Sequence, residues 1–254
     1  MAHIITIANK KGGTGKSTTA HALAHGLYKR GYKTLLIDLD QQGNATLNSG
    51  INCNDKGIIT SLDFMQGKTG AIIHTGSVDV IPANNSLSLA NTTFTTIGKE
   101  YKLKEALAPV LSSYDFIVID TPPTMEIMTI NALATSNDVI IPVQADVFNI
   151  QGIAELKQVI ETVQRYCNPQ LKVAGLLLTR YNARATLNKD IKELLENIAK
   201  TLKTQLFTVT ITQCIAITEA QAEQQSIFDY APKSKGATQY NAFIDEYLKG
   251  VKLK

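Results

Sequence analysis

The sequence predicts an α/β fold, a doubly wound and mostly parallel sheet flanked by helices. Short apolar runs recur along the chain, and amphipathic segments of helical period lie between them. Strands of a parallel sheet appear as near-continuous apolar runs because helices cover both faces. Such runs are found at residues 3–8, 33–40, 78–82, 114–123, 138–146 and 172–179. Alternating strands and helices imply right-handed crossovers, with ligands at the carboxyl ends of the strands.

The first run, HIITIA, leads into the glycine-rich segment KGGTGKS and a helix that begins near Ser17. Backbone N–H groups of such a loop turn towards phosphate oxygens, and the helix N-terminus adds the positive end of its dipole. Lys16 would reach the β- and γ-phosphates, and the Ser17 hydroxyl would bind Mg²⁺. A glycine-rich turn with a chance G-K-S is the alternative. The predicted nucleotide-binding residues here are Gly12, Gly13, Thr14, Gly15, Lys16, Ser17 and Thr18.

Two lysines stand where this loop departs from the ordinary pattern. G-x-x-x-x-G-K-[ST] would place a glycine at position 10, where the chain has Lys10 followed by Lys11. Two adjacent lysines are unremarkable in a solvated loop, so by themselves they do not indicate a function.

Acidic residues end the second and the fourth apolar runs. Asp38 and Asp40 close the run at 33–40, and Asp120 closes FIVID. A phosphate loop needs a carboxylate opposite it to hold Mg²⁺ and a polar group to orient the attacking water. We expect Asp120 to meet the first need and Asp40 the second. Aspartates also end strands as turn residues, which is the alternative for any one of them alone.

The segments between the strands are helical or irregular. Residues 43–77 are rich in Gly, Asn, Thr and Ser and are expected to form an excursion from the sheet, with a short helix around SLDFMQG. Two later segments have the period of amphipathic helices, and the second has Thr186 as its expected N-cap. Their predicted apolar stripes are Ile153, Leu156, Val159, Ile160 and Val163, and Leu187, Ile191, Leu194, Leu195, Ile198 and Leu202.

Length and composition favour one domain over residues 1–254, with 44% hydrophobic and 19% charged residues. Because the chain starts on its first strand, we expect no N-terminal DNA-reading domain. No apolar stretch reaches the roughly 20 residues of a membrane-spanning helix, and a cytoplasmic location is expected. Cys53, Cys167 and Cys214 are widely spaced, which favours neither a disulfide framework nor a zinc site. The net charge of +3 permits an anionic partner without requiring one.

Four segments together resemble one family. KKGGTGKST, LLIDLDQQGNAT, YDFIVIDTPP and VIIPVQAD are similar to the ParA/MinD superfamily of deviant Walker P-loop ATPases, and most similar to short Soj-type ParA proteins that partition DNA. The resemblance extends from Ile4 to about Ala242. It implies ATP and Mg²⁺ as cofactors, slow hydrolysis, an ATP-dependent homodimer and a ParB-like centromere-binding partner that stimulates hydrolysis. The variant end, CIAITEAQAEQQSIFDYAP, is more similar to the plasmid and integrative-element branch.

The resemblance gives the unusual lysine a role. Lys11 matches the family's signature lysine, which crosses the dimer interface to the partner's nucleotide, and a cation supplied in this way stabilises charge on the transferring phosphoryl group. It also implies that Asp40 positions the hydrolytic water, that Asp120 is the Walker B acid, and that Asp38 supports either the Mg²⁺ shell or the neighbourhood of Lys16. Gln144 and Pro232 match segments that line the adenine pocket or the dimer face, although strand-end and turn structure explains them equally well.

The resemblance also implies binding to DNA without sequence preference, through phosphate contacts on one face. The candidate residues are Arg180, Arg184, Lys189 and Lys192. Glu193 and Glu196 in the same segment favour an ordinary solvated helix face instead. Relatives often carry arginines where this chain has Gln213 and Ala216, so one expected phosphate contact is missing.

Two rival functions share the same motifs. A MinD-like membrane ATPase would need a C-terminal amphipathic helix with a broad apolar face, whereas YNAFIDEYLKGVKLK has a short stripe interrupted by acids. We therefore expect this segment to pack as a last core helix, without stable membrane binding. An ATP-dependent metabolic ligase on the same fold would not need Lys11 in trans. An iron-sulfur reductase would need paired cysteines, which the three scattered ones do not supply.

Overall fold

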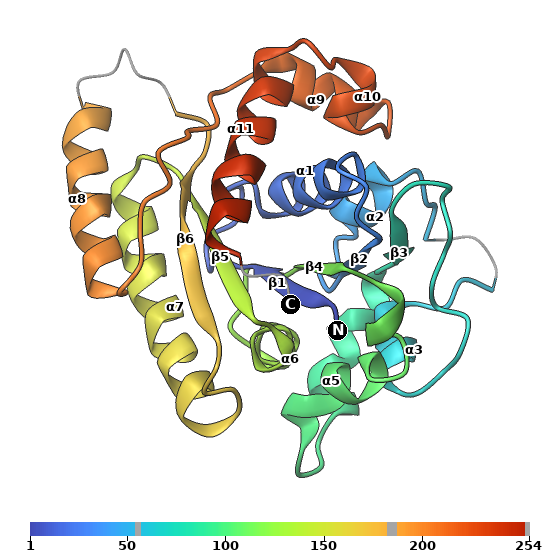
Figure 1. Cartoon of the computed structure of the whole chain (residues 1–254). Helices are drawn as coiled ribbons and strands as arrows, with labels where there is room; N and C mark the ends of the chain where they lie inside the picture. Colours follow the sequence, from blue (N-terminus) through green and yellow to red (C-terminus); the bar gives the residue numbers. More distant parts are fainter. Residues whose placement is uncertain (54–56, 182–186, 252–254) are drawn as a thin grey trace.

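The computed structural model describes residues 1–53, 57–181 and 187–251, and only the backbone of 147–151 and 187–190. It contains a six-stranded sheet in the order β3-β2-β4-β1-β5-β6, whose neighbouring strands are all parallel (Figure 1). Each strand lies within one of the six predicted apolar runs, which confirms the predicted α/β fold. The strands are β1 (His3–Ile7), β2 (Thr34–Asp38), β3 (Asp79–Ile81), β4 (Phe116–Asp120), β5 (Asp138–Val143) and β6 (Lys172–Leu178).

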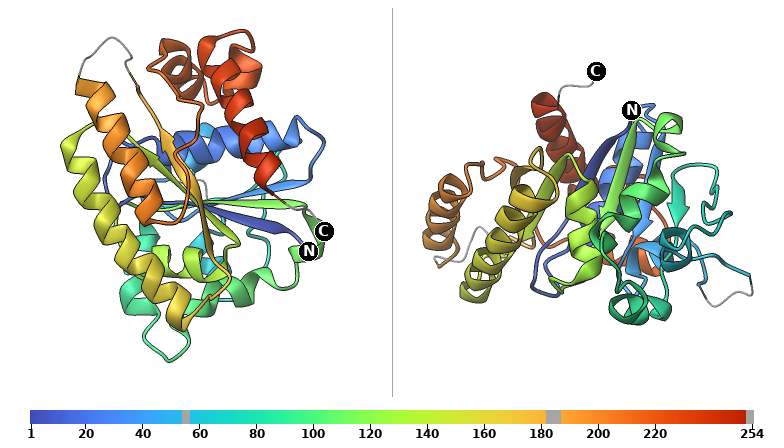
Figure 2. Two further views of the ribbon diagram at one scale, coloured as in Figure 1. Left: turned by 60° about the vertical axis from the view of Figure 1, so that its left-hand side comes forward. Right: turned by 90° about the horizontal axis from the view of Figure 1, so that it is seen from below.

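Helices lie on both faces of the sheet, as Figure 2 shows from two further sides. The α-helices in the described ranges are α1 (Lys16–Tyr28), α2 (Asn44–Asn48), α3 (Ser61–Met65), α4 (Ala90–Thr93), α5 (Lys102–Leu107), α6 (Ile127–Thr135), α7 (Val147–Tyr166), α8 (Leu187–Thr201), α9 (Ile215–Ala222), α10 (Ile227–Tyr230) and α11 (Lys235–Gly250). Short 3₁₀ turns are η1 (Asn85–Leu89), η2 (Lys99–Tyr101) and η3 (Leu111–Ser113).

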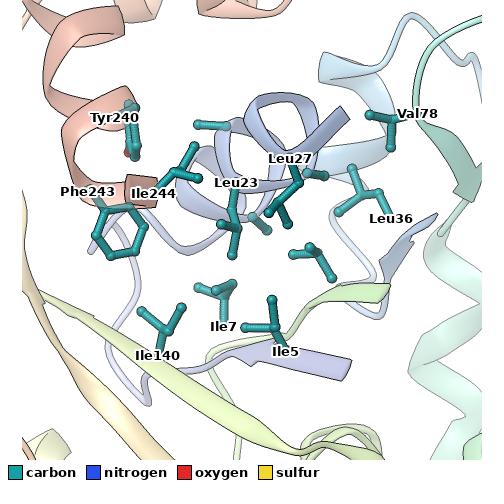
Figure 3. Close-up of a cluster of buried hydrophobic side chains, with 14 of the residues drawn as sticks. Ile5, Ile7, Leu23, Leu27, Leu36, Val78, Ile140, Tyr240, Phe243 and Ile244 are labelled. Atoms are coloured by element: carbon teal, nitrogen blue, oxygen red, sulfur yellow. The ribbon is translucent and has the colours of Figure 1, made fainter. Parts of the chain in front are cut away.

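One face of the sheet is covered by α1 and α11. Their apolar side chains form a core with alternate residues of the strands (Figure 3). Leu23 and Leu27 of α1 and Phe243 and Ile244 of α11 are fully buried in it. Full burial of one such side chain stabilises the fold by roughly 1.5–3 kcal/mol. The helix that follows the phosphate loop is therefore held against the sheet along its length.

The opposite face carries α3, α5 and α6 over one half of the sheet and α7 and α8 over the other half. The strands supply both faces by simple alternation, because successive side chains of a strand point to opposite sides. In β4, Phe116 and Val118 join the α1 core while Ile117 and Ile119 join the opposite one. This double burial explains why the strands are apolar throughout.

The predicted stripe of α8 is partly wrong. Ile191 and Leu195 are buried, and Ile198 and Leu202 pack against the same core, as the predicted stripe requires. Leu194 is 43% exposed, and the side chain of Leu187 lies outside the described residues. The sequence period gives the direction of a helix face but does not show where that face ends.

The predicted short helix of the 43–77 excursion is present as α3, where Thr60 and Asp63 form a capping box. Helix α2, which precedes it, was not predicted. The final helix packs as expected, since Phe243, Ile244 and Tyr247 are buried against α1 and the sheet. Among the described residues, no helix combines the length and the apolar character that crossing a membrane requires.

Candidate functional site

The predicted phosphate loop and the predicted acids meet at one edge of the sheet. Parallel pairing places Ile7 beside Asp120, and Asp120 beside Asp38, so that β1, β4 and β2 end at the same level. Residues 8–15 connect the end of β1 to the start of α1. The fold thus brings together residues that are more than one hundred positions apart in the sequence.

The loop presents an uncapped helix N-terminus. Gly13 and Gly15 have φ values of +75° and +85°, a left-handed conformation that glycine adopts without strain. Gly15 is the N-cap of α1, and among the described residues no side chain caps it and no acidic residue lies in the first turn. The first N–H groups of α1 are thereby left for an external acceptor, the arrangement that binds anions at helix N-termini.

Asn9 fixes the start of the loop. Its side chain is fully buried, donates from Nδ2 to the carbonyl of Pro142 at 2.7 Å, and accepts the N–H of Lys11 at 3.0 Å. One amide therefore ties β5 to the backbone of Lys11. The sequence analysis missed Asn9, and an isolated Asn after a strand gives no signal beyond that of a turn residue.

Lys16 lies inside the site. Its side chain is buried, and its Nζ donates to the carbonyl oxygen of Lys11 at 3.2 Å. Burial lowers the pKa of Lys16, while the carboxylates of Asp120 and Asp40 act in the opposite direction. A buried cation near two carboxylates at an anion-binding helix terminus is suited to contact a phosphate group.

Asp120 is fully buried at the end of β4. Within the described residues, neither of its carboxylate oxygens has a hydrogen-bond partner. Burial raises the pKa of Asp120 well above its ordinary value, and the charge of Asp38 adds to this. The Ser17 hydroxyl, close by but short of hydrogen-bond geometry, and Lys16 oppose the shift. A buried carboxylate beside a hydroxyl is a set of hard oxygen donors that fits Mg²⁺.

Asp38 is engaged by the protein itself. Its Oδ2 accepts the N–H of Thr46 at 2.9 Å and the Thr46 hydroxyl at 2.8 Å, and its Oδ1 accepts the N–H of Asp40 at 3.0 Å. Burial raises the pKa of Asp38 to about 6. These contacts favour a positioning role for Asp38 over the predicted role in the Mg²⁺ shell. Thr46, which the sequence analysis missed, also accepts the N–H of Ala83 at 2.9 Å.

Asp40 lies on the tight turn that Asp38 holds. It is 6% exposed, and its Oδ1 accepts the N–H of Gln42 at 3.0 Å. The Asp40 carbonyl accepts the N–H of Gly43, which has a left-handed φ of +63°. The carboxylate is thus oriented by the turn and lies close enough to Lys16 to affect its pKa, as a group that orients water beside a phosphate must be.

Lys11 is half-buried and paired within its own chain. Its Nζ donates to Oδ1 of Asp146, just beyond the end of β5, at 2.7 Å, and both side chains are 33% exposed. Its neighbour Lys10 pairs with Glu155 on α7. Lys11 is therefore less solvated than an ordinary loop lysine, whereas Lys10 is exposed.

The remaining nucleotide candidates differ in whether they contact the phosphate loop. Gln144 donates from Nε2 to the carbonyl of Gly13 at 2.6 Å, which places it on the phosphate loop. The hydroxyl of Thr18 accepts from the side chain of Gln221 on α9 at 2.8 Å. Pro232 is exposed after α10, and in the described part of the chain no hydrogen bond joins it to the loop.

Of the DNA candidates, Arg180 lies two residues beyond the end of β6. Arg180 is exposed and left-handed, with φ +50°, and the next residue, Tyr181, pairs with Thr212 in a parallel bridge. The fold thus places the 180 segment beside the 212 segment, where relatives were expected to carry arginines. Lys192 on α8 is half-buried. Arg184 and the side chain of Lys189 lie outside the described residues.

Comparison with known proteins gives matches over nearly the full chain. The AAA domain family matches residues 2–173. Sporulation initiation inhibitor protein Soj of Bacillus subtilis strain 168 is 35% identical, covering 94% of this chain and 96% of that protein. Chromosome partitioning protein ParA of Myxococcus xanthus DK1622 is 34% identical, covering 98% and 89%.

Solved structures also match this chain over nearly its full length. Cobyrinic acid a,c-diamide synthase from Mycobacterium smegmatis, with bound ATP analog and magnesium, has a TM-score of 0.86 at 30% identity, covering 100% of this chain and 98% of that one. A plasmid partition protein from Borrelia burgdorferi B31, bound to AMPPNP, has a TM-score of 0.81 at 26% identity, covering 99% and 100%.

Proposed function

This chain belongs to the ParA/MinD superfamily of P-loop ATPases, among its Soj-type members, and from that premise we propose that it is a DNA-partition ATPase. ATP would join two copies into a dimer that binds nonspecific DNA, and a ParB-like partner would stimulate hydrolysis and release it. The observation that carries the proposal is the meeting of Lys16, Asp40 and Asp120 at an uncapped helix N-terminus. We further propose that residues 1–254 form a single ATPase domain that acts in the cytoplasm on the nucleoid.

The nucleotide would be held chiefly by the backbone of residues 12–18. Lys16 would leave the Lys11 carbonyl and turn its ammonium group to the terminal phosphate. Ser17 and Asp120 would hold Mg²⁺, which when bound neutralises charge on the phosphates. The buried Asp120 carboxylate supports this, because a cation beside it would offset the cost of its burial.

Hydrolysis would depend on Asp40, which accepts a hydrogen bond from the attacking water and orients it. Asp38 and Thr46 would act on hydrolysis only through Asp40, because their hydrogen bonds fix the turn that carries it. Slow turnover is part of the proposal: a single oriented carboxylate positions the water, and further stabilisation of the transferring phosphoryl group is left to groups supplied on assembly.

Dimerisation would use Lys11. To reach a second copy's nucleotide, its ammonium group must leave Asp146, so the exchange of one anionic partner for another would accompany assembly. The two states then differ in a charge pair at the loop. This links the presence of ATP to the form of the protein that binds DNA.

DNA would be bound through exposed basic side chains that contact phosphates, with Arg180, Arg184, Lys189 and Lys192 as the proposed residues. Such contacts give affinity and salt dependence without reading sequence. The position of Arg180 beside the 212 segment supports the proposal, because both segments then lie on one edge.

The test is fluorescence anisotropy of a random-sequence DNA duplex titrated with Asp40→Ala protein, in ATP, in ADP and without nucleotide. This variant should bind ATP and dimerise but stall hydrolysis. Binding is expected with ATP alone, and log affinity should fall with log salt by about 0.9 per phosphate contacted. Absence of binding at low salt in all three states would contradict the DNA-partition function.

Two further variants locate the cause of a positive result. Lys11→Ala in the same background should keep nucleotide binding and lose the dimer, as measured by light scattering, together with ATP-dependent DNA binding. If the Lys11→Ala protein dimerises and binds DNA like its parent, the proposed exchange of Lys11 between partners is wrong. Lys29→Ala, which removes a surface pair with Asp229 at the far end of α1, is the matched control.

A second candidate is an ATP-dependent ligase, favoured by the 30% identity to the solved cobyrinic acid a,c-diamide synthase. Such an enzyme would hydrolyse ATP in proportion to amide product and would need no DNA. Incubation with cobyrinic acid, ATP and ammonia, followed by mass spectrometry, separates the two candidates. Amide formation would favour the ligase, and its absence together with ATP-dependent DNA binding would favour partition.

A further inference from the structure

Thr179 contacts the phosphate loop from the end of β6. It is the residue after Leu178, is 3% exposed, and donates from Oγ1 to the carbonyl oxygen of Thr14 at 2.8 Å. Its own N–H donates to the carbonyl of Val143 at 2.7 Å, which anchors it to β5. The hydroxyl also lies 3.1 Å from that carbonyl, but the shorter contact is with the loop.

This bond fixes the orientation of a peptide group. In a trans peptide the C=O and the following N–H point in opposite directions. Because the Thr14 carbonyl is held towards Thr179, the N–H of Gly15 faces the other way. Gly15 is the left-handed N-cap of α1, where small rotations of the peptide change the direction of the N–H most freely.

The side chain of Thr179 also lies close to Gly15. A Cβ at position 15, which glycine lacks, would be 3.8 Å from the methyl group of Thr179, an ordinary van der Waals distance. The preceding peptide is held in a similar way, because Gln144 donates to the carbonyl of Gly13 at 2.6 Å. Successive loop peptides are therefore oriented from the ends of β6 and β5.

We propose that Thr179 is a positioning residue for the nucleotide phosphates: its hydroxyl holds the Thr14 carbonyl and thereby aims the Gly15 N–H at the bound anion. A backbone N–H that is already oriented binds a phosphate oxygen without a further ordering cost. Thr179 acts on bound nucleotide only through the loop. The inference rests on the nucleotide-binding part of the proposed function and is independent of DNA.

The experiment compares Thr179→Val with the parent chain. Valine keeps the shape of threonine and removes the hydroxyl. The loop amides bind the phosphates alike before and during hydrolysis, so KM for ATP should rise while kcat stays within about twofold. The expected rise is roughly 5- to 10-fold, the size of one net hydrogen bond. The dissociation constant of ADP, measured by isothermal titration calorimetry, should rise by the same factor.

A second pair keeps the test decisive if valine disturbs folding. Thr179→Ser retains the hydroxyl and Thr179→Ala lacks it, while both lack the methyl group. Serine should bind ADP within about twofold of the parent, and alanine should bind it roughly 5- to 10-fold more weakly. Thr204→Val is the matched control, because the Thr204 hydroxyl donates at 2.6 Å to the carbonyl of Val173, near the other end of β6.

Four results would overturn the inference: Thr179→Val with the parent's KM, serine and alanine variants equally weakened, Thr204→Val with the same loss, or a fall in kcat at constant KM. Failure of the proposed function is distinguishable from these. A parent chain that does not bind ADP contradicts nucleotide binding itself, whereas a parent that binds it and a Thr179→Val variant that binds it equally well contradict only the role of Thr179.

Discussion

Thr179 and Arg180 are neighbours in the sequence but belong to regions that the fold holds very differently. Thr179 belongs to the nucleotide end, the loop at 8–15 with the adjoining strand ends, where Lys16 and Asp120 are buried. Arg180 belongs to the edge formed by the segments around residues 180 and 212, here called the 180–212 edge, and its side chain is exposed. Burial strengthens each polar contact and makes its loss costly, whereas water and salt screen exposed charges. Substitutions should therefore have large effects at the nucleotide end and small, additive ones at the edge.

The largest effect is expected for Lys16→Ala. The substitution removes the buried cation whose charge acts on Asp40 and Asp120, so the carboxylates and the phosphates are left without compensation. ATP hydrolysis should fall by at least about 100-fold, the scale for loss of one charge-stabilising donor. Phosphate release under saturating ATP measures it, with Lys29→Ala on the same helix as control. Hydrolysis within threefold of the parent would contradict the expected large effects of substitutions at the nucleotide end.

A smaller effect is expected for Thr46→Val. Thr46 contacts Asp38, which in turn binds the backbone of Asp40, so it acts on the site only indirectly. Valine removes the hydroxyl that donates to Asp38 and accepts from Ala83, so Asp38 loses one of its bonds and the buried N–H of Ala83 loses its acceptor. The free energy of unfolding should fall by about 1–3 kcal/mol, as urea titration can measure. Hydrolysis should fall as well, because Asp38 also holds the turn that carries Asp40. Thr162→Val, which removes a bond on the exposed side of α7, is the control and should change neither quantity appreciably.

Stability against pH gives a third, intermediate effect. Burial raises the pKa of Asp38 to about 6 and lowers the pKa of His25, on the buried side of α1, to about 4. Between pH 4 and 6 the folded chain keeps a proton on Asp38 that the unfolded chain loses, so this group destabilises the fold as pH rises. His25 acts oppositely, because below pH 6.5 the unfolded chain gains a proton that the folded chain does not bind.

Variants should separate these opposing slopes. Without nucleotide, His25→Leu should make the unfolding free energy rise, relative to the parent, as pH falls from 6 to 4. Asp38→Asn should do the reverse. Each full proton contributes a slope of about 1.4 kcal/mol per pH unit. Urea unfolding at pH 4, 5, 6 and 7 is the measurement, and parallel curves for all three proteins would exclude both shifts.

The smallest effect is expected at the 180–212 edge. Arg180→Ala removes one exposed charge and should leave ATP hydrolysis without DNA unchanged. In the Asp40→Ala background it should lower DNA affinity a few-fold and reduce the salt slope by about 0.9, one phosphate contact. Lys172→Ala, an exposed charge at the start of β6 and away from this edge, serves as the control. Equal losses in the two variants would mean that the edge is not a specific contact surface.

Much of the nucleotide end was predictable because its signals are local. The six apolar runs, the loop and the acids at strand ends are each readable within a few residues. The 180–212 edge was less predictable, because the bridge between Tyr181 and Thr212 joins segments that are distant in the sequence. The predicted apolar stripe of α8 wrongly included Leu194, which is exposed. The sequence period gives the direction of a helix face but not how wide a part of it is covered.

The sequence by itself determined the α/β class, the order of strands and helices along the chain, and the residue types of a phosphate site. Tertiary structure alone decided that Asn9 binds Pro142, that Lys11 pairs with Asp146, and that Thr179 holds the loop. The physical reason is that a hydrogen bond between remote residues depends on strand order and register, which no local pattern carries. The side chains that orient the site are ordinary polar residues, and they become specific only through their neighbours.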